Sequence, residues 1–259
     1  MLDTPKRIMI KVAYDGTDYH GWQKQDGHRT IEGELNSVLS EIFKEPIEVI
    51  GASRTDAGVH ALGNVAVFDT HVDIPAEKVP YAMNQKLPED IKVVEGKDVP
   101  ENFHPRHCDT LKTYHYKIVN TPFEDPVRRR YAHWTFEALD AEKMQAAAAP
   151  LVGEHDFTTF CSVNAQVDSK VRTITDITVT RNDDEIIIAV TGTGFLYNMV
   201  RIIAGTLMEA GKGKITAADV KDMLEKQDRT AGGPTAPAKG LTLHKYQFLS
   251  LGDGVSGSF

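Results

Sequence analysis

Two separate segments of the chain have the alternating pattern of a strand with one buried face, and each begins a stretch of mixed strand and helix patterns. Aliphatic residues occupy every second position from Ile8 to Val12, and apolar residues do so from Tyr114 to Ile118. The patterns that follow lack the regular strand–helix–strand alternation of a parallel sheet. The sequence therefore favours an α+β fold with antiparallel sheets, in which residues 1–105 form one half and residues 106–259 the other, with the boundary near Pro105.

Helix signals divide each half further. Thr30 can cap a helix whose apolar residues recur at helical spacing as far as Phe43, and Pro46 prevents its continuation. Further helices are expected near 79–84, 140–151 and 195–210 and after Thr216, and further strands at 47–52, 65–68, 173–180, 185–190 and 241–248.

Composition is that of an ordinary soluble globular protein, with 41% hydrophobic and 25% charged residues. Residues 1–7 lack the apolar core of a signal peptide, and no apolar run reaches membrane length, so we expect a cytoplasmic protein with no membrane association. The two cysteines, Cys108 and Cys161, form no Cys-x-x-Cys pair, which favours free thiols over a disulfide framework.

The net charge of −8 argues against non-specific attraction to a polyanion. Any nucleic-acid binding must therefore depend on local basic clusters. Such clusters occur at Arg128, Arg129 and Arg130, at Lys112 with Lys117, and at Arg201. Taken alone, the three consecutive arginines are better interpreted as a solvated surface than as a phosphate-binding track.

The segment from Gly51 to Gly63 is the strongest candidate for chemistry. A predicted strand leads into a polar turn in which Arg54 and Asp56 are two residues apart, so in extended geometry their side chains share a face, and Gly58 allows the backbone to reverse. The alternative is an aspartate that accepts hydrogen bonds from turn amides beside a surface arginine. From the spacing alone, that alternative is the better interpretation.

A longer sequence match favours the catalytic interpretation of Asp56 over the structural one. The eight residues Arg54-Thr55-Asp56-Ala57-Gly58-Val59-His60-Ala61 resemble the signature loop of the tRNA pseudouridine synthase A family. Further blocks resemble the same family in its order, and they span nearly the whole chain: Tyr14-Asp15-Gly16, Gly21-Trp22-Gln23, Phe103-His104-Pro105-Arg106, Lys112-Thr113-Tyr114-His115-Tyr116, Asp156-Phe157-Thr158-Thr159-Phe160, Asn198-Met199-Val200-Arg201 and Ala238-Lys239-Gly240-Leu241.

The resemblance implies two ferredoxin-like or RRM-like halves whose sheets join around a central active-site cleft. It also implies a homodimer that converts uridines at positions 38, 39 and 40 of the tRNA anticodon stem-loop to pseudouridine. By the same resemblance, the catalytic residues are Asp56, Tyr114 and Arg201, and the substrate-binding residues include Arg54 and Leu241. Lys112 and the arginines 128–130 are added as phosphate-binding candidates. Two positions depart from the family pattern: Ser53 replaces a frequent glycine and Lys112 a frequent arginine.

The reaction suits these residues. It breaks the N1–C1′ bond of uridine, rotates the uracil and joins C5 to C1′, so it is redox-neutral and we expect no cofactor. Asp56 could attack C1′, stabilise an oxocarbenium-like sugar or take a sugar proton to form a glycal, and the sequence does not choose among these roles. Because a base inside a stem is inaccessible, the nucleotide must be flipped out, and Tyr114 could then stack on uracil or act on its C5 proton.

Two other functions would leave different marks on the sequence. An RNA-binding protein without activity would be expected to have lost Asp56, and a nucleoside or glycoside hydrolase would need a second carboxylate near it. We expect no metal, because His104, His107 and Cys108 lack a second pair of ligands at a matching spacing.

Overall fold

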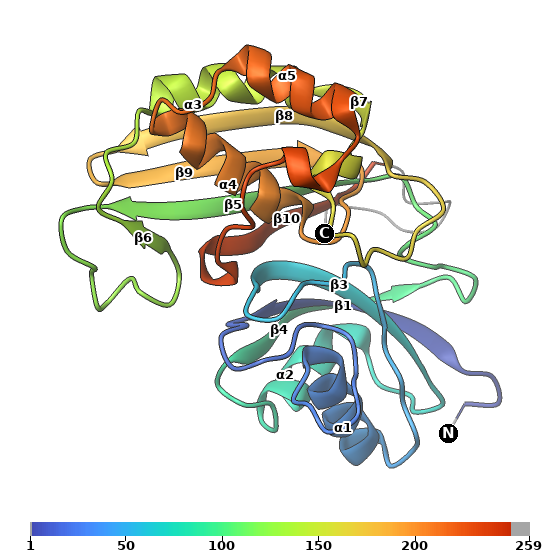
Figure 1. The fold of residues 1–259 in the computed structure, drawn as a ribbon. Coiled ribbons are helices and arrows are strands. Elements are labelled where there is room, and N and C mark those ends of the chain that lie inside the picture. Colours follow the sequence, from blue (N-terminus) through green and yellow to red (C-terminus); the bar gives the residue numbers. More distant parts are fainter. Residues whose placement is uncertain (1, 250–259) are drawn as a thin grey trace. The chain divides into compact units, whose positions relative to one another are not determined.

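The computed structural model describes residues 2–249, and the chain divides into two compact units. Of the described residues, the first unit contains 2–110 and 243–249, and the second contains Leu111–Thr242. Both units combine an antiparallel sheet with helices on one of its faces (Figure 1). The predicted α+β class is thereby confirmed.

The first unit is built on the strand order β4-β1-β3-β10. β1 (Lys6–Tyr14) pairs antiparallel with both β3 (His60–Thr70) and β4 (Ile91–Val99), and the two-residue strand β2 (Ile50–Gly51) pairs with β3. The helices α1 (Ile31–Phe43) and α2 (Val79–Asn84) lie on one face of this sheet (Figure 1). A hydrophobic cluster that includes Met9, Val65 and Val67 forms part of the core.

The second unit has the strand order β5-β9-β8-β7, with α3 (Ala141–Ala148), α4 (Met199–Gly211) and α5 (Ala217–Lys226) over one face (Figure 1). The strands are β5 (Thr110–Asn120), β7 (Gly153–Asp156), β8 (Val171–Asn182) and β9 (Glu185–Gly192). The short strand β6 (His133–Thr135) pairs parallel with β5, in an otherwise antiparallel arrangement of the strands named above. Short 3₁₀ turns occur at Ala76–Lys78, Ala149–Leu151, Thr158–Phe160, Arg229–Ala231 and Ala238–Gly240.

The unit boundary differs from the predicted halves 1–105 and 106–259, because β10 (Leu241–Phe248) leads the chain back into the first unit. Tyr246 on β10 is buried in the same cluster as Met9, and Cys108 packs against that cluster. The Tyr246 hydroxyl also donates to the Pro105 carbonyl at 3.0 Å. This association joins residues far apart in the chain, which a boundary drawn from local patterns cannot anticipate.

Local signals predicted several element ends correctly. The Thr30 side chain caps α1 by accepting from the Gly33 amide, and Lys44 ends that helix in a left-handed conformation at φ 57°. The capping box of Thr216 and Asp219 begins α5. In contrast, the helix predicted from residue 195 begins only at Met199, after Asn198 with φ 61°.

The strand predicted at 47–52 is reduced to Ile50–Gly51. The reason is that side chains of α1 take the backbone donors of the preceding residues. The Ile47 amide donates to Ser40 Oγ at 2.9 Å and the Val49 amide to Asn36 Oδ1 at 2.8 Å. Among residues 2–249, no helix combines the length and apolar character needed to cross a membrane.

Candidate active site

The predicted catalytic loop connects β2 to β3 in the first unit. Its side chains alternate between the interior and the surface: Ser53 and Thr55 are buried, Arg54 is exposed, and Asp56 is half-buried. Arg54 and Asp56 therefore point away from the core, as their two-residue spacing predicted. Gly58 reverses the chain with φ 76°, and the Val59 amide donates to the Asp56 carbonyl at 3.1 Å, which closes the turn.

A second loop, residues 15–30, supports this turn. The Trp22 amide donates to the Thr55 carbonyl at 3.0 Å, and the Gly58 amide donates to the Tyr19 carbonyl at 3.2 Å. The approach is so close that a Cβ atom on Gly16 would lie 2.0 Å from the Val59 carbonyl oxygen. The glycine of the Tyr14-Asp15-Gly16 block is thus required by the packing of one loop on the other.

Arg106 is a cation near this loop to which sequence reasoning assigned no role. Its Nε donates to the Gly51 carbonyl at 2.8 Å, at the point where β2 enters the loop. Burial lowers the pKa of Arg106, and the positive charge of Arg54 lowers it further. Two guanidinium groups therefore act on the same region of the first unit. The signal was available, because Arg106 ends the block that begins at Phe103.

Tyr114 lies on β5 of the second unit, opposite Val190 of β9. It is buried, and its ring packs edge-on against Phe195 with centroids 5.1 Å apart. Lys112 lies two residues earlier on the same strand and is partly exposed, so its side chain is on the same face as that of Tyr114.

Arg201 lies in the first half of α4 and is partly buried. Its Nε donates to the Ala236 carbonyl and its Nη1 to Asn198 Oδ1, both at 2.8 Å. These bonds fix the guanidinium from two segments of its own unit. Its charge also acts on Tyr116, whose pKa is raised by burial and lowered in part by Arg201. Leu241, at the start of β10, is buried.

The three consecutive arginines lie in the loop between β5 and β6, and they differ from one another. Arg128 donates to Asp125 and forms a bidentate ion pair with Asp184, and the N–O distances are 2.6 to 2.9 Å. These carboxylates raise the pKa of Arg128. Its charge is already matched, so Arg128 anchors the loop to the β8–β9 turn, whereas Arg129 and Arg130 are exposed.

The structure thus distributes the predicted residues over both units. The first unit brings Arg54 and Asp56 together in one loop. The second unit contains the remaining predicted residues: Lys112, Tyr114, Arg128, Arg129, Arg130, Arg201 and Leu241. Within residues 2–249 no group of three or more His, Cys, Asp or Glu side chains is arranged to hold a metal ion.

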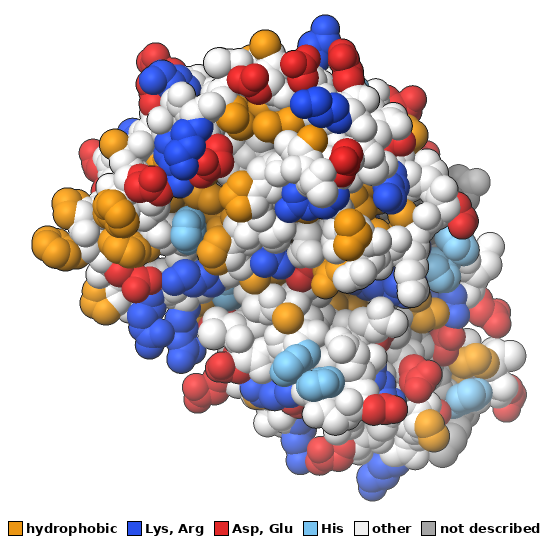
Figure 2. All heavy atoms as spheres, viewed as in Figure 1, with side chains coloured by type: hydrophobic (Ala, Val, Ile, Leu, Met, Phe, Trp, Pro, Cys, Tyr) orange, Lys and Arg blue, Asp and Glu red, His pale blue; other side chains and the backbone are white. Residues whose placement is uncertain are grey.

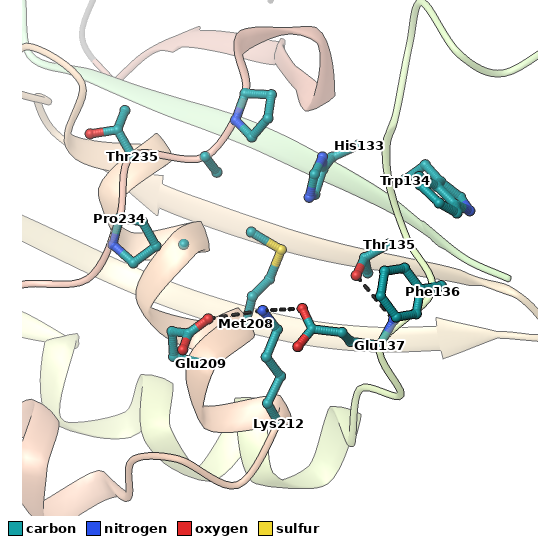
Figure 3. Close-up of a pocket in the computed structure, with 13 residues that line it drawn as sticks. His133, Trp134, Thr135, Phe136, Glu137, Met208, Glu209, Lys212, Pro234 and Thr235 are labelled. Atoms are coloured by element: carbon teal, nitrogen blue, oxygen red, sulfur yellow. Dashed lines mark hydrogen bonds and ion pairs between the residues drawn. The ribbon is translucent and has the colours of Figure 1, made fainter. Parts of the chain in front are cut away.

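A cavity of about 290 Å³ lies elsewhere in the second unit, between β6, α4 and residues 234–237 (Figure 3). Trp134, Phe136 and Met208 contribute its apolar wall, and Lys212 bridges Glu137 and Glu209 at its edge. None of the predicted catalytic residues lines this cavity. Arg201 nevertheless contacts its wall, because its Nε donates to the carbonyl of Ala236, which lines the cavity.

Comparison with known proteins agrees with the resemblance of the motifs. A family model described as tRNA pseudouridine synthase matches residues 10–107 and 147–248. A tRNA pseudouridine synthase A of Halalkalibacterium halodurans is 48% identical over 237 residues, which cover 91% of this chain and 90% of that protein. A protein of the same name from a Thermoanaerobacter species is 47% identical over 93% of this chain and 98% of its own length. Another from Bacillus subtilis is 45% identical over 92% of this chain and 97% of its own length. The chain belongs to the tRNA pseudouridine synthase family, a family of isomerases.

Proposed function

We propose that the chain converts uridine to pseudouridine at positions 38, 39 and 40 of the tRNA anticodon stem-loop, with Asp56 as the catalytic carboxylate. The observation that carries the proposal is the loop around Asp56. Its half-buried carboxylate points away from the core on a turn that is hydrogen-bonded to neighbouring backbone, and the loop lies within residues 10–107, which match the family model. A turn held in one conformation suits a catalytic group that must be positioned against one atom of its substrate.

In this reaction the N1–C1′ bond breaks, the detached uracil rotates, and C5 bonds to C1′. The proton lost from C5 is balanced by the proton gained at N1, so the product is an isomer and no electron donor is needed. Asp56 acts on the sugar in one of three ways: it attacks C1′, stabilises positive charge on the sugar or accepts a sugar proton.

The other roles are assigned by chemistry. Tyr114 stacks on the flipped uracil, and its hydroxyl is the candidate group for the C5 proton. The family resemblance gives Arg201 the role of the arginine that partners the catalytic aspartate. Leu241 supplies an apolar contact to the base. In this proposal the first unit supplies the aspartate loop and the second unit completes the site.

Phosphate contacts are proposed for exposed or partly exposed cations. Arg54 suits a phosphate next to the flipped nucleotide, and Lys112 suits a neighbouring one. Arg129 and Arg130 suit the wider tRNA backbone, and Figure 2 shows Lys and Arg side chains gathered where the β5–β6 loop runs. Arg128, which the sequence placed in the same group, supports them by holding the loop.

The experiment is the Asp56→Asn variant, which keeps the side-chain volume and removes the charge. We expect no pseudouridine in tRNA, while the thermal unfolding profile and tRNA affinity stay near those of the wild type. Asp18→Asn, at an exposed position of the first unit, is the matched control and should retain activity. Turnover by Asp56→Asn near the wild-type rate would contradict the assignment of Asp56. A wild-type protein that leaves tRNA unmodified, or that releases free uracil, would contradict the proposed reaction.

A homodimer in the cytoplasm is the second part of the proposal. The surface that supports it is the β5–β6 loop, where Phe123 and Val127 are 85% and 83% exposed, and Phe136 beyond β6 is 71% exposed. Exposed large apolar side chains that gather in one patch mark protein-interaction sites, and aromatic residues are enriched in protein interfaces. Figure 2 shows hydrophobic side chains gathered at this edge of the second unit.

This surface contains both the exposed side chains of Phe123 and Val127 and the cavity beside β6. A contact between two identical copies needs a surface that is complementary to itself. The Glu124–Lys239 ion pair, at 2.9 Å, ties the β5–β6 loop to the segment that follows the cavity wall at residues 234–237. A second copy could thus place its Phe123 against the apolar wall formed by Trp134 and Phe136.

The oligomeric state provides the test. Wild-type protein should sediment as a dimer, and the double variant Phe123→Asp with Val127→Asp should sediment as a monomer. Tyr81→Asp, which alters a side chain that is 70% exposed on the first unit, should leave the dimer intact. A wild-type monomer at micromolar concentration would exclude the dimer, and a dimeric double variant would exclude this surface.

A further inference from the structure

A buried polar cluster lies directly beneath the Asp56 loop, within the first unit. The Tyr14 hydroxyl forms a 2.7 Å hydrogen bond with Thr55 Oγ1, and Asn64 Nδ2 donates to the Tyr14 oxygen at 3.3 Å and to the Ser53 carbonyl at 2.8 Å. Asn64 is completely buried, and Tyr14, Ser53 and Thr55 are each at most 7% exposed. Burial raises the pKa of the Tyr14 phenol, so the phenol stays protonated.

The cluster contacts the two residues that alternate with the proposed functional ones. Ser53 and Thr55 point inward and accept or share these hydrogen bonds, while Arg54 and Asp56 point outward. The position of each outward side chain is therefore determined by the anchoring of its inward neighbour. Burying the side chains of Tyr14, Asn64 and Thr55 is unfavourable unless their hydrogen bonds are made, so these three hold their geometry as a unit. Ser53 takes part through its carbonyl.

The strand geometry directs Tyr14 at the loop. The pairing of β1 with β3 shifts register between Val12 and Tyr14, where Val12 is opposite Asn64 and Tyr14 is opposite Ala61. A bulge of this kind changes the direction of a side chain, and such irregularities are frequent beside active sites. The extra residue lies on β3, because two steps along β1, from Val12 to Tyr14, correspond to three steps along β3, from Asn64 to Ala61.

Thr55 is also held from the other side. The Trp22 amide donates to its carbonyl at 3.0 Å, and a Cβ atom on Gly21 would lie 2.6 Å from that same oxygen. The side chain and the carbonyl of Thr55 are thus bonded to different segments of the unit. A residue fixed at both groups has little freedom to rotate, and Asp56 follows it directly in the chain.

We infer that Tyr14 and Asn64 are positioning residues for the reaction, acting through the Thr55 hydroxyl and the Ser53 carbonyl to place the Asp56 carboxylate. The inference rests on the proposed function, because it concerns the geometry of that same carboxylate. Displacement of a reacting group by about 1 Å lowers a rate by roughly 100-fold. The cluster therefore sets the turnover rate while making no contact with tRNA.

The experiment compares variants that remove one hydroxyl each. Tyr14→Phe and Thr55→Val break the same hydrogen bond from its two ends, and each should lower kcat by about 10- to 100-fold. The KM for tRNA should stay within about twofold, because the phosphate-binding side chains are untouched. Thr55→Ser, which retains the hydroxyl, should restore a rate near that of the wild type.

The double variant Tyr14→Phe with Thr55→Val should be no slower than either single variant, because the shared hydrogen bond is already lost in each. Tyr246→Phe is the matched control. It removes a buried hydroxyl of the same unit that donates to Pro105 rather than to the loop, so it should lower thermal stability but not kcat.

The outcomes separate the two proposals. If wild-type protein forms pseudouridine and Asp56→Asn does not, the proposed function holds independently of these variants. If kcat is then unchanged in Tyr14→Phe and Thr55→Val, the positioning role is wrong. An equal loss of kcat in Tyr246→Phe, or no recovery in Thr55→Ser, would also overturn it, because the effect would then reflect general destabilisation.

Discussion

Replacing Asn64 by leucine is the most direct test of how much the buried cluster contributes to folding. The Asn64 carboxamide makes three hydrogen bonds: its Nδ2 donates to the Ser53 carbonyl and to Tyr14, and its Oδ1 accepts from the Val65 amide at 2.9 Å. Leucine has a similar volume and can replace none of them. The substitution therefore removes polar contacts without opening a large cavity.

The magnitude follows from the groups that lose a partner. The Ser53 carbonyl and the Val65 amide are backbone groups of buried residues, and a buried group left unsatisfied costs about 1 to 3 kcal/mol. Extra apolar burial by leucine offsets on the order of 1 kcal/mol. The net loss is about 3 kcal/mol, which corresponds to a fall in Tm of roughly 6 to 12 °C for a chain of this size.

Asn84→Leu is the matched control. Like Asn64, Asn84 hydrogen-bonds to the backbone through both ends of its carboxamide. It donates to the Val93 carbonyl at 2.8 Å and accepts from the Val93 amide at 2.9 Å, but it is only half-buried. Because Asn84 itself is half-buried whereas Asn64 is completely buried, we expect a smaller loss of about 1 kcal/mol. Calorimetry of both variants measures the difference. A Tm for Asn64→Leu equal to or above that of Asn84→Leu would refute the argument from burial.

Four further outcomes are expected. Tyr114→Phe should retain tRNA binding and lose turnover if its hydroxyl moves the C5 proton, whereas normal turnover in a tRNA modification assay would leave only stacking. Activity should persist in chelator-treated buffer, because the isomerisation needs no oxidant, and rescue by an added divalent ion alone would contradict this, provided that the tRNA stayed folded. Alanine at Arg129 and Arg130 should flatten the salt dependence of tRNA affinity by roughly 0.7 to 0.9 per lost phosphate contact without changing which uridine is modified. Hydrogen bonding to Arg128 lowers the pKa of Asp184, so the ion pair should stabilise the β5–β6 loop above about pH 4. This stabilisation should be lost as the pH falls through the lowered pKa of Asp184, and cleavage of the loop by an acid-active protease can measure the loss.

Much of the fold could be predicted because its signals are local. The cap at Thr30 and the capping box at Thr216 and Asp219 depend on residues within one helical turn. The strand at 47–52 was wrong for most of its length because Ser40 and Asn36, on the preceding helix, take the amides that a strand would have used. That competition depends on how the helix packs, which no strand propensity contains.

The same distinction applies to the site. The outward alternation of Arg54 and Asp56 is a property of extended backbone, so their spacing was sufficient to predict it. The three arginines from Arg128 looked equivalent in sequence, yet Asp184, which neutralises Arg128, lies 56 residues further along the chain. Charge patterns show where cations gather but not which of them are already paired.

The supports of the Asp56 loop show why residues that position a reacting group are harder to find than those that react. Tyr14 and Thr55 are 41 residues apart, and Tyr14 and Asn64 are 50 apart, so no local window contains the cluster. The antiparallel register of β1 on β3 brings these positions together, with one extra residue of β3 between Asn64 and Ala61. A signature loop identifies the carboxylate because chemistry restricts the residue type, whereas its supports become visible only once the strand register is known. Buried polar side chains that bond to the backbone beside a reacting residue are therefore the first places to seek further determinants of rate in this fold.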